Sequence, residues 1–460
     1  MERKPHVVAI PYPAQGHVIP MMKVAQYLAE NGLKVTFVNT EFNHQRVTKA
    51  LSQTGNIHEL VNLVSIPDGL ESWEDRNEHG KLAEASVKIM PKELENLIQE
   101  MNRTESDDII TCVLVDFYMA GILPVVEKFG IKRAAFLPAP VALLALTLNV
   151  QKLVDDGIVD ADGTPLTNQP IQLAPLMPKM SPMNFAWACF PDPSMGKPIF
   201  QSIIQNNESS KLIQRLICNS STELEQPALN FIPNCSPIGP LLPSSHRLGK
   251  SAGHFWPEDS TCLAWLDQQP PNSVVYVAFG SFTVFDAIQF EELALGLEST
   301  NRPFLWVVRQ DTNRDNEIEE AYPAGFAERV KNRGKMVGWS PQEQVLSHPA
   351  VACFISHCGW NSTVEGIGNG VPLLCWPYFA DQFLNRSYIV DHWGVGLGLE
   401  KDETGIVRKE EIRVNVERIF DDEGYKSRAV KLQAKIFSSA HEGGSSHLNF
   451  HSFINWIKDN

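Results

Sequence analysis

Short apolar runs rich in valine and isoleucine alternate with amphipathic stretches along the chain, and this alternation predicts strands that alternate with helices. The first unit has an apolar run at 6–10, a loop with proline and glycine, an apolar-periodic helix over 18–32 and a second run at 34–40. Pro20 suits the first turn of that helix. This order predicts a parallel β-α-β unit, and such sheets bind ligands at the carboxyl ends of their strands.

The same alternation returns after residue 273 and continues to the last quarter of the chain. Between the two halves, residues 241–258 are rich in serine, glycine and proline, which is typical of a linker. We therefore expect an α/β protein with an N-terminal domain over 1–240, a C-terminal domain over 259–440 and a final helix within 441–460.

The charge and cysteine content exclude several classes of function. A net charge of −15 argues against a nucleic-acid or anionic-membrane surface, because both need excess lysine and arginine. Eight cysteines without C-x-x-C spacing indicate reduced thiols in a cytosolic protein. The longest uncharged run, 134–151, contains two prolines, and the start of the chain lacks the pattern of a signal peptide. We expect a cytoplasmic protein without a membrane segment.

Two ionisable residues fall at the carboxyl ends of predicted strands in the first half. His17 lies where the first loop meets the first helix, and Asp116 ends the apolar run of residues 112–115. Because carboxyl ends of parallel strands share one edge, the two side chains can meet although they are 99 positions apart. An imidazole held by a carboxylate can take the proton from a hydroxyl group.

The stretch 339–382 contains strands and helices in quick succession, so its loops should line one crevice at the carboxyl edge of the second sheet. Trp339 offers a flat face for a nucleotide base. Gln342 and Glu365 can form hydrogen bonds with ribose hydroxyls. The stretch therefore has the residue types that recognise a nucleoside.

The remaining polar groups of this stretch suit a diphosphate and a sugar. The segment 357–362 places backbone N–H groups, Asn361 and Ser362 at a helix start, where a diphosphate is favoured. Asp381 and Gln382 supply acceptors and donors for sugar hydroxyls. Together they indicate a nucleotide-sugar site.

Four segments carry a resemblance to a known family: 14–29, 113–117, 277–281 and the 44 residues of 339–382. At these segments the chain resembles the plant secondary-product UDP-glycosyltransferases. The resemblance implies a GT-B fold, in which two Rossmann-like parallel-sheet domains face each other across a cleft. It also implies that the acceptor binds to the N-terminal half and the UDP-sugar to the C-terminal half, with the last helix returning to the first domain.

The resemblance also implies roles for individual residues. His17 would be the general base and Asp116 its partner, and Gln382 is the residue that goes with glucose as the transferred sugar. The chain departs from the family at 138–140, where Pro-Ala-Pro replaces a segment with a Ser or Thr that reaches the sugar. That contact is in doubt here. The donor site implied by the family comprises Ser281, Trp339, Gln342, His357, Trp360, Asn361, Ser362, Glu365, Asp381 and Gln382.

We expect an inverting, metal-independent transfer of glucose from UDP-glucose to a hydroxyl of a hydrophobic small molecule, by a monomeric enzyme. The composition of residues 155–200, rich in proline, aspartate and methionine, predicts long irregular loops. Such loops are candidates for a wall of the acceptor pocket. The aromatic candidates for that pocket are Phe117, Tyr118, Phe185, Trp187, Phe190, Phe282 and Phe379.

Two other functions remain open from the sequence: transfer to a carbon of a phenolic ring, and binding of a UDP-sugar or an aglycone without turnover. The His17 and Asp116 pair counts against the second. A metal-binding motif is not expected at Asp160-Ala161-Asp162, because the following glycine predicts a turn. The first loop also lacks the G-x-G-x-x-G pattern of nicotinamide-binding proteins.

Overall fold

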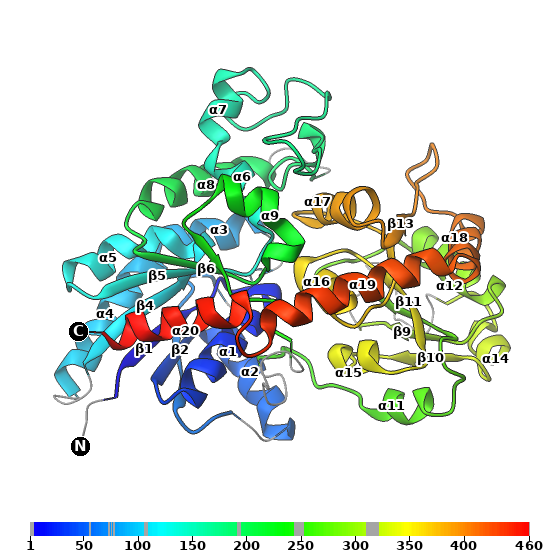
Figure 1. Ribbon diagram of the computed structural model, residues 1–460, viewed down its shortest axis with the longest axis horizontal. Helices are drawn as coiled ribbons and strands as arrows, with labels where there is room; N and C mark the ends of the chain where they lie inside the picture. Colours follow the sequence, from blue (N-terminus) through cyan, green and yellow to red (C-terminus); the bar gives the residue numbers. More distant parts are fainter. Residues whose placement is uncertain are drawn as a thin grey trace. The chain divides into compact units, whose positions relative to one another are not determined.

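The computed structural model describes residues 4–54, 57–71, 74, 76, 79–104, 109–190, 195–242, 253–309 and 322–459. The chain divides into two compact units (Figure 1). The first contains residues 1–256, 379–381 and 436–460, and the second contains residues 257–378 and 382–435. Residues 243–252 of the expected linker lie outside the described residues.

The first unit is built on a seven-stranded parallel sheet with the order β3-β2-β1-β4-β5-β6-β7. The order reverses between β1 and β4, which are neighbours in the sheet although four helices and two strands of the described residues separate them in sequence. The strands are β1 His6–Ile10, β2 Lys34–Thr40, β3 Val61–Ile66, β4 Ile110–Asp116, β5 Lys132–Leu137, β6 Arg215–Cys218 and β7 Cys235–Pro237.

Helices join these strands and bury their apolar sides on the sheet (Figure 1). The helices of the first unit are α1 Gln15–Glu30, α2 Glu41–Thr54, α3 His79–Lys88, α4 Met90–Thr104, η1 Phe117–Ile122, α5 Leu123–Lys128, α6 Val141–Leu148, α7 Val150–Asp155, η2 Pro182–Asn184, α8 Gly196–Ser210, α9 Thr222–Phe231 and α20 Ser445–Lys458. Helix α1 begins at Gln15, so Pro20 lies one turn inside the helix and not in its first turn.

The last helix completes the core of the first unit. Phe450, Phe453 and Ile454 of α20 are buried in the same apolar cluster as residues of β1, β2 and α1. Burying each such side chain contributes about 1.5–3 kcal/mol. The ring of Phe450 lies 4.4 Å from the ring of Tyr27 on α1, which ties the end of the chain to the first helix.

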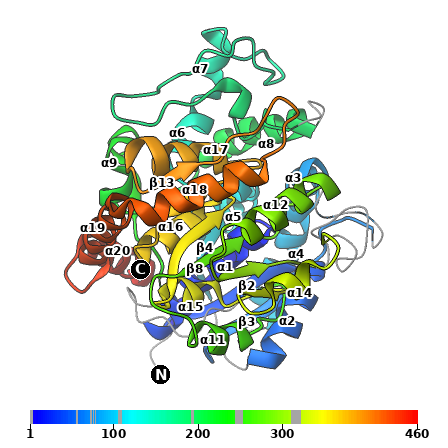
Figure 2. The ribbon, with the colours of Figure 1, turned by 90° about the vertical axis from the view of Figure 1, so that its right-hand side faces the viewer.

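The second unit, which faces the viewer in Figure 2, repeats the plan with a parallel sheet. This sheet has six strands in the order β10-β9-β8-β11-β12-β13. Its strands are β8 Val274–Ala278, β9 Phe304–Val307, β10 Gly334–Val337, β11 Val351–Ser356, β12 Leu373–Cys375 and β13 Gly396–Gly398. Its helices are α11 Thr261–Leu266, α12 Ala287–Ser299, α14 Phe326–Val330, α15 Gln342–Ser347, α16 Trp360–Gly368, α17 Gln382–Ser387, the π-helix η4 Tyr388–His392, α18 Lys409–Asp421 and α19 Glu423–Ala440.

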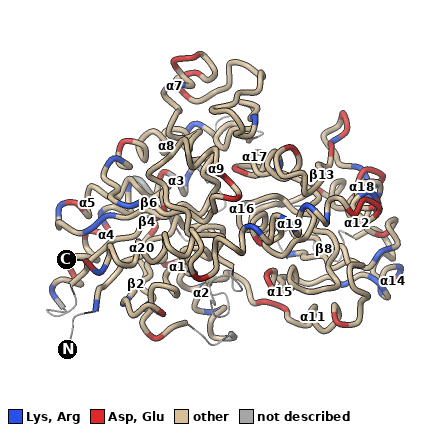
Figure 3. The backbone as a smooth tube through the Cα atoms, in the orientation of Figure 1, with Lys and Arg blue, Asp and Glu red and all other residues tan. Residues whose placement is uncertain are grey.

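Both sheets therefore have the order of a Rossmann-like fold, which confirms the predicted fold class. In each unit the order reverses beside the first strand, between β1 and β4 and between β8 and β11. Ligands of open α/β sheets bind at this point. Acidic and basic residues are interspersed along both units (Figure 3).

Candidate active site

The reversal of strand order explains why His17 and Asp116 meet. Ile10 at the end of β1 pairs with Val115 of β4, so the next residues of both strands leave the sheet at the same edge. The chain after β1 turns into α1, and His17 lies in the first turn of that helix. Asp116 is the last residue of β4. Strand pairing thus brings the two side chains together.

The two side chains form a direct hydrogen bond. His17 Nδ1 lies 2.8 Å from Asp116 Oδ2, and the other carboxylate oxygen accepts from the backbone N–H of Tyr118 at 3.0 Å. Asp116 therefore also caps η1. Its side chain is 0% exposed, whereas the side chain of His17 is 23% exposed. Because the carboxylate only accepts, Nδ1 carries the proton and Nε2 has the open lone pair.

Two tyrosines flank the imidazole of His17. Its ring centroid lies 5.1 Å from that of Tyr12 and 5.7 Å from that of Tyr118. Burial raises the pKa of Tyr12 and of Tyr118, and the negative charge of Asp116 adds to both shifts, so both phenols are neutral at physiological pH. The histidine thus lies in a largely aromatic environment with one carboxylate partner.

The aromatic candidates for an acceptor pocket fall into different environments. Phe185 and Trp187 are buried, and their rings pack against one another at 5.0 Å, with Phe200 against Trp187 at 5.3 Å. Trp187 Nε1 also donates to the carbonyl of Gly163 at 2.9 Å, which joins this aromatic pair to the turn at Gly163. Phe117 is buried beside Asp116.

The other candidates belong to two groups. Phe379 is part of the first unit, and its ring lies 6.4 Å from the ring of Phe190. Phe282 belongs to the second unit, in the loop that follows β8.

The Asp160 carboxylate accepts from the N–H groups of Asp162 and Thr164 at 2.9 and 2.8 Å, which confirms the predicted turn there.

The second unit places His357 against the loop after β8. Ala278 of β8 pairs with Ser356 of β11, so Gly280 and His357 emerge beside each other. Gly280 has a φ of +67°, and a Cβ there would lie 2.6 Å from His357 Nε2. Both observations favour glycine at this position. Arg309 donates to the carbonyls of Gly280 and Thr283, the latter at 3.1 Å, and so supports the loop that contains Ser281.

The imidazole of His357 is uncharged at neutral pH. Its pKa is lowered to about 4, mainly by burial; a hydrogen bond with the Ala278 backbone opposes this shift, and the guanidinium of Arg309 adds to it. A neutral imidazole still has one N–H donor. When that N–H donates to the Ala278 carbonyl, the other ring nitrogen keeps a lone pair, and Nδ1 is buried with no hydrogen-bond partner among the described residues.

The segment after β11 is shaped for an anion. Cys358 has a φ of +65°, Gly359 is the N-cap of α16, and no side chain caps the first turn. The helix start offers backbone N–H groups and the positive end of the helix dipole. Asn361 and Ser362 lie in that first turn.

Gln342, Ser362 and Glu365 form one hydrogen-bonded group. Gln342 Nε2 donates to Ser362 Oγ at 2.9 Å and to Glu365 Oε2 at 2.7 Å. Gln342 Oε1 accepts from the hydroxyl of Tyr276 at 3.1 Å, and that hydroxyl also lies 2.9 Å from Ser340 Oγ. The helix starts of α15 and α16 are thereby joined through side chains.

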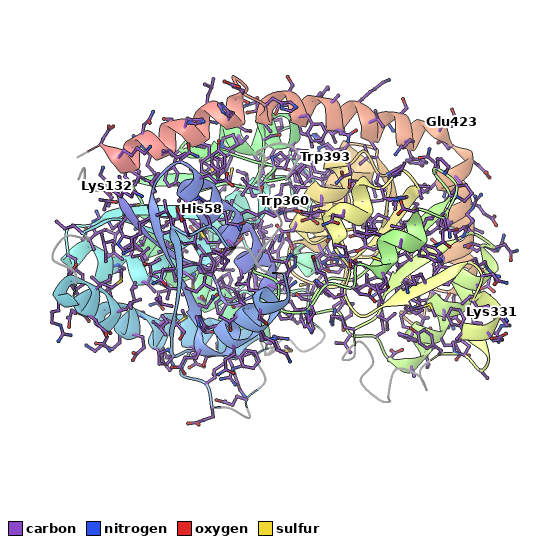
Figure 4. The ribbon with its side chains drawn as sticks, turned by 90° about the horizontal axis from the view of Figure 1, so that it is seen from below. His58, Lys132, Lys331, Trp360, Trp393 and Glu423 are labelled. Atoms are coloured by element: carbon purple, nitrogen blue, oxygen red, sulfur yellow. The ribbon has the colours of Figure 1, made fainter. Side chains whose placement is uncertain are left out.

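The remaining donor candidates differ in exposure. Trp360 is 3% exposed, and its ring lies 6.5 Å from that of Tyr388 and 6.4 Å from that of Trp393, so its indole is a core group. Trp360 and Trp393 are labelled in Figure 4. The buried side chain of Gln382 accepts from the N–H of Tyr378 at 2.7 Å.

Trp339 and Asp381 complete the set of predicted donor residues. Trp339 follows β10, and its carbonyl accepts from the N–H of Asp259 at 2.8 Å. Asp381 is grouped with the first unit.

Sequence reasoning missed Tyr12, Tyr276, Ser340 and Arg309. Tyr276 lies inside an apolar strand, where the pattern predicts an ordinary core residue. Arg309 follows β9 at the carboxyl edge, and this position alone was the signal that could have found it.

Within the described residues, the side chains form no group of three or more that could hold a metal ion. Among the helices that the structure describes, none is long and apolar enough to cross a bilayer.

Comparisons with known proteins agree with this architecture. Residues 197–441 match the family model described as UDP-glucoronosyl and UDP-glucosyl transferase. The chain is 47% identical to UDP-glycosyltransferase 83A1 of Arabidopsis thaliana over 99% of this chain and 97% of that protein.

Two solved structures extend the comparison. Os79 from O. sativa in complex with UDP has 29% identity and a TM-score of 0.80, covering 98% of this chain and all of that chain. A UDP-glucosyltransferase from Polygonum tinctorium capable of glucosylating indoxyl, in complex with 3,4-dichloroaniline, has 25% identity and a TM-score of 0.83, covering all of both chains.

The chain belongs to the plant UDP-glycosyltransferase family. It is therefore a glycosyltransferase, an enzyme that takes a sugar from a UDP-linked donor.

Proposed function

We propose that this enzyme transfers glucose from UDP-glucose to a hydroxyl group of a hydrophobic small molecule, with inversion at the anomeric carbon. The observation that carries this proposal is the His17 to Asp116 hydrogen bond of 2.8 Å at the edge of the first sheet. It gives the first unit an oriented base, which an acceptor hydroxyl needs before it can attack.

In the proposed reaction His17 Nε2 takes the proton of the acceptor hydroxyl. The acceptor oxygen forms a bond to the anomeric carbon while the bond from that carbon to the diphosphate oxygen breaks, and UDP leaves with that electron pair. Attack opposite to the leaving group converts an α-linked donor into a β-glucoside. Asp116 stabilises the imidazolium that forms, because its carboxylate lies against Nδ1.

The leaving diphosphate gains negative charge as the bond breaks. In this proposal Ser281, His357, Asn361, Ser362 and the first N–H groups of α16 stabilise that charge. Preorganised donors of this type usually make the largest contribution to catalysis.

His357 is uncharged at neutral pH, so in this proposal it would lie beside the diphosphate as a polar group that adds no positive charge. Trp339 would stack on the uracil, and Glu365 would accept from the ribose hydroxyls.

Glucose as the transferred sugar has two supports. In the resembled family a glutamine at the end of this stretch, here Gln382, goes with glucose. The Polygonum tinctorium relative is also a UDP-glucosyltransferase. Asp381 and Gln382 would contact the sugar hydroxyls.

A hydrophobic acceptor is supported by the rings of Tyr12 and Tyr118 beside His17. The structure of the Polygonum tinctorium enzyme is a complex with an aromatic molecule, 3,4-dichloroaniline.

The test is a panel of hydrophobic phenols and alcohols with UDP-glucose, UDP-galactose and UDP-glucuronate, read by mass spectrometry. We expect hexosylated products with UDP-glucose, and an anomeric proton coupling that identifies the β-linkage. Acid hydrolysis should release glucose, whereas a C-glycoside would survive. Preference for another donor would refute the glucose assignment.

His17→Ala serves as the variant that tests the base. It should abolish transfer while it leaves UDP affinity unchanged. Retained turnover of hydroxyl acceptors by His17→Ala would overturn the assignment of the base.

A further inference from the structure

The direction of each hydrogen bond around Gln342 follows from which of its two groups can donate and which can only accept. Glu365 is a carboxylate and only accepts, so the amide nitrogen of Gln342 must face it, at 2.7 Å. The second proton of that nitrogen is donated to Ser362 Oγ at 2.9 Å. Both amide protons of Gln342 are therefore engaged inside the protein.

The fixed amide sets the direction of the other bonds. Gln342 Oε1 can only accept, so the Tyr276 hydroxyl 3.1 Å away is the donor. Tyr276 must then accept from Ser340, whose Oγ lies 2.9 Å from it. Since Ser362 accepts from Gln342, its own hydroxyl proton is directed elsewhere, and no acceptor for that proton is found among the described residues.

We propose that Tyr276 is a positioning residue for the donor nucleotide. By holding the amide of Gln342, it makes Ser362 a hydrogen-bond donor toward the diphosphate and Glu365 an oriented acceptor for a ribose hydroxyl. Gln342 thus orients two contact residues. This inference rests on the proposed function, in which the nucleotide binds at these residues.

The hydroxyl of Tyr276 can be removed with little change in packing. Its side chain is 1% exposed, and its ring stacks on Phe354 with centroids 4.9 Å apart and an interplanar angle of 28°. A phenylalanine keeps that ring contact. It leaves Gln342 Oε1 without its donor, so the amide loses the bond that holds it beside Glu365 and Ser362.

The experiment compares Tyr276→Phe with the unmodified enzyme by calorimetric titration with UDP and with 2′-deoxyuridine diphosphate. The unmodified enzyme should prefer UDP. In the variant, UDP should bind about tenfold more weakly, which is the order expected for one unsatisfied buried acceptor. The preference for ribose over deoxyribose should also shrink, a change that a general loss of stability would not produce.

Tyr322→Phe is the matched control. Tyr322 lies in the same unit, its ring stacks on Phe326 at 5.4 Å, and its hydroxyl makes no hydrogen bond within the described residues. This variant should bind both nucleotides with unchanged affinity. A double variant of Tyr276→Phe with Gln342→Leu should lose no more affinity than Gln342→Leu alone, because the tyrosine acts through the glutamine.

The outcomes separate this inference from the proposed function. Equal binding of both nucleotides by the unmodified enzyme would refute the ribose contact itself. If Glu365→Ala removes the preference but Tyr276→Phe keeps it, the role of Tyr276 is overturned and the proposed site stands. If Tyr276→Phe does not fold, Ser340→Ala is the second variant, because it removes the donor to the Tyr276 hydroxyl. If the ratio of its affinities for UDP and 2′-deoxyuridine diphosphate equals that of the unmodified enzyme, the inference is equally overturned.

Discussion

Replacing Asp116 with asparagine should disable the base while the fold is kept. Asp116 accepts two hydrogen bonds, one per oxygen: from His17 Nδ1 at 2.8 Å and from the Tyr118 N–H at 3.0 Å. Asparagine has one oxygen, so its NH₂ group must face one of these two donors. The backbone N–H of Tyr118 cannot change, whereas a neutral imidazole can move its proton to the other nitrogen. The amide oxygen should therefore stay on Tyr118, and the His17 proton should move to Nε2.

This change of tautomer sets the size of the effect. With a proton on Nε2, His17 cannot accept the proton of the acceptor hydroxyl. General-base catalysis contributes about 10²–10⁴-fold, or about 3–5 kcal/mol of barrier at about 1.4 kcal/mol per tenfold. The same substitution in a serine-protease triad lowers kcat by about 10⁴-fold. We therefore expect Asp116→Asn to lose about 10²–10⁴-fold in kcat/KM.

The assay is the rate of UDP release with a series of phenolic acceptors of increasing acidity, with UDP affinity measured by calorimetry. The loss should be largest for the least acidic acceptor, which depends most on the base, and UDP affinity should be unchanged. Asp68→Asn is the control, because Asp68 is also buried and accepts from Leu70 N–H and Arg76. Activity within about threefold of the unmodified enzyme, or an equal loss for all acceptors, would refute this reasoning.

Three further predictions concern two residues of the second unit and one buried carboxylate of the first unit. Gly280→Ala should weaken UDP binding in calorimetry, because its φ is +67° and the new Cβ would meet His357, whereas Gly338→Ala has open space and should not. The lowered pKa of His357, about 4 against an ordinary value near 6.5, means that its stabilising contribution is complete above pH 6.5 and is lost as the pH falls toward 4. His357→Asn should therefore flatten the dependence of Tm on pH in that window. Glu225→Gln should lower the free energy of unfolding by about 1–3 kcal/mol in urea titrations, because that buried carboxylate accepts from two N–H groups at the start of α6 and from a serine hydroxyl.

The sequence was sufficient for the fold because local pattern and topology agree. Buried strands such as β1 and β8 are short apolar runs, and helices between them enforce parallel pairing. Once strands are parallel, residues at their carboxyl ends share one edge, and this alone predicted that His17 and Asp116 could meet. The start of α1 was less predictable, because residues 15–17 have no apolar periodicity of their own.

What the sequence could not provide is the set of partners that each polar group finds. Tyr276 and Phe354 look alike in their strands, yet only Tyr276 has a hydroxyl, and its use depends on the placement of Gln342 after another strand. The aromatic residues of 155–200 are another example. Their composition alone could not show that Phe185 and Trp187 pack against each other, because apolar side chains in long loops can pack together as well as line a pocket.

The two units use one architecture for two kinds of histidine chemistry. Each sheet reverses its strand order beside the first strand, and each has a histidine at that edge, His17 in one and His357 in the other. His17 has a buried carboxylate 2.8 Å from Nδ1, an environment that stabilises the imidazolium and suits a group that must gain a proton. His357 is desolvated and lies near Arg309, and both features lower its pKa and keep the ring uncharged at neutral pH. The charge of the neighbour can be tested: a carboxylate in place of Arg309 should raise the pKa of His357, and its negative charge should oppose binding of a diphosphate.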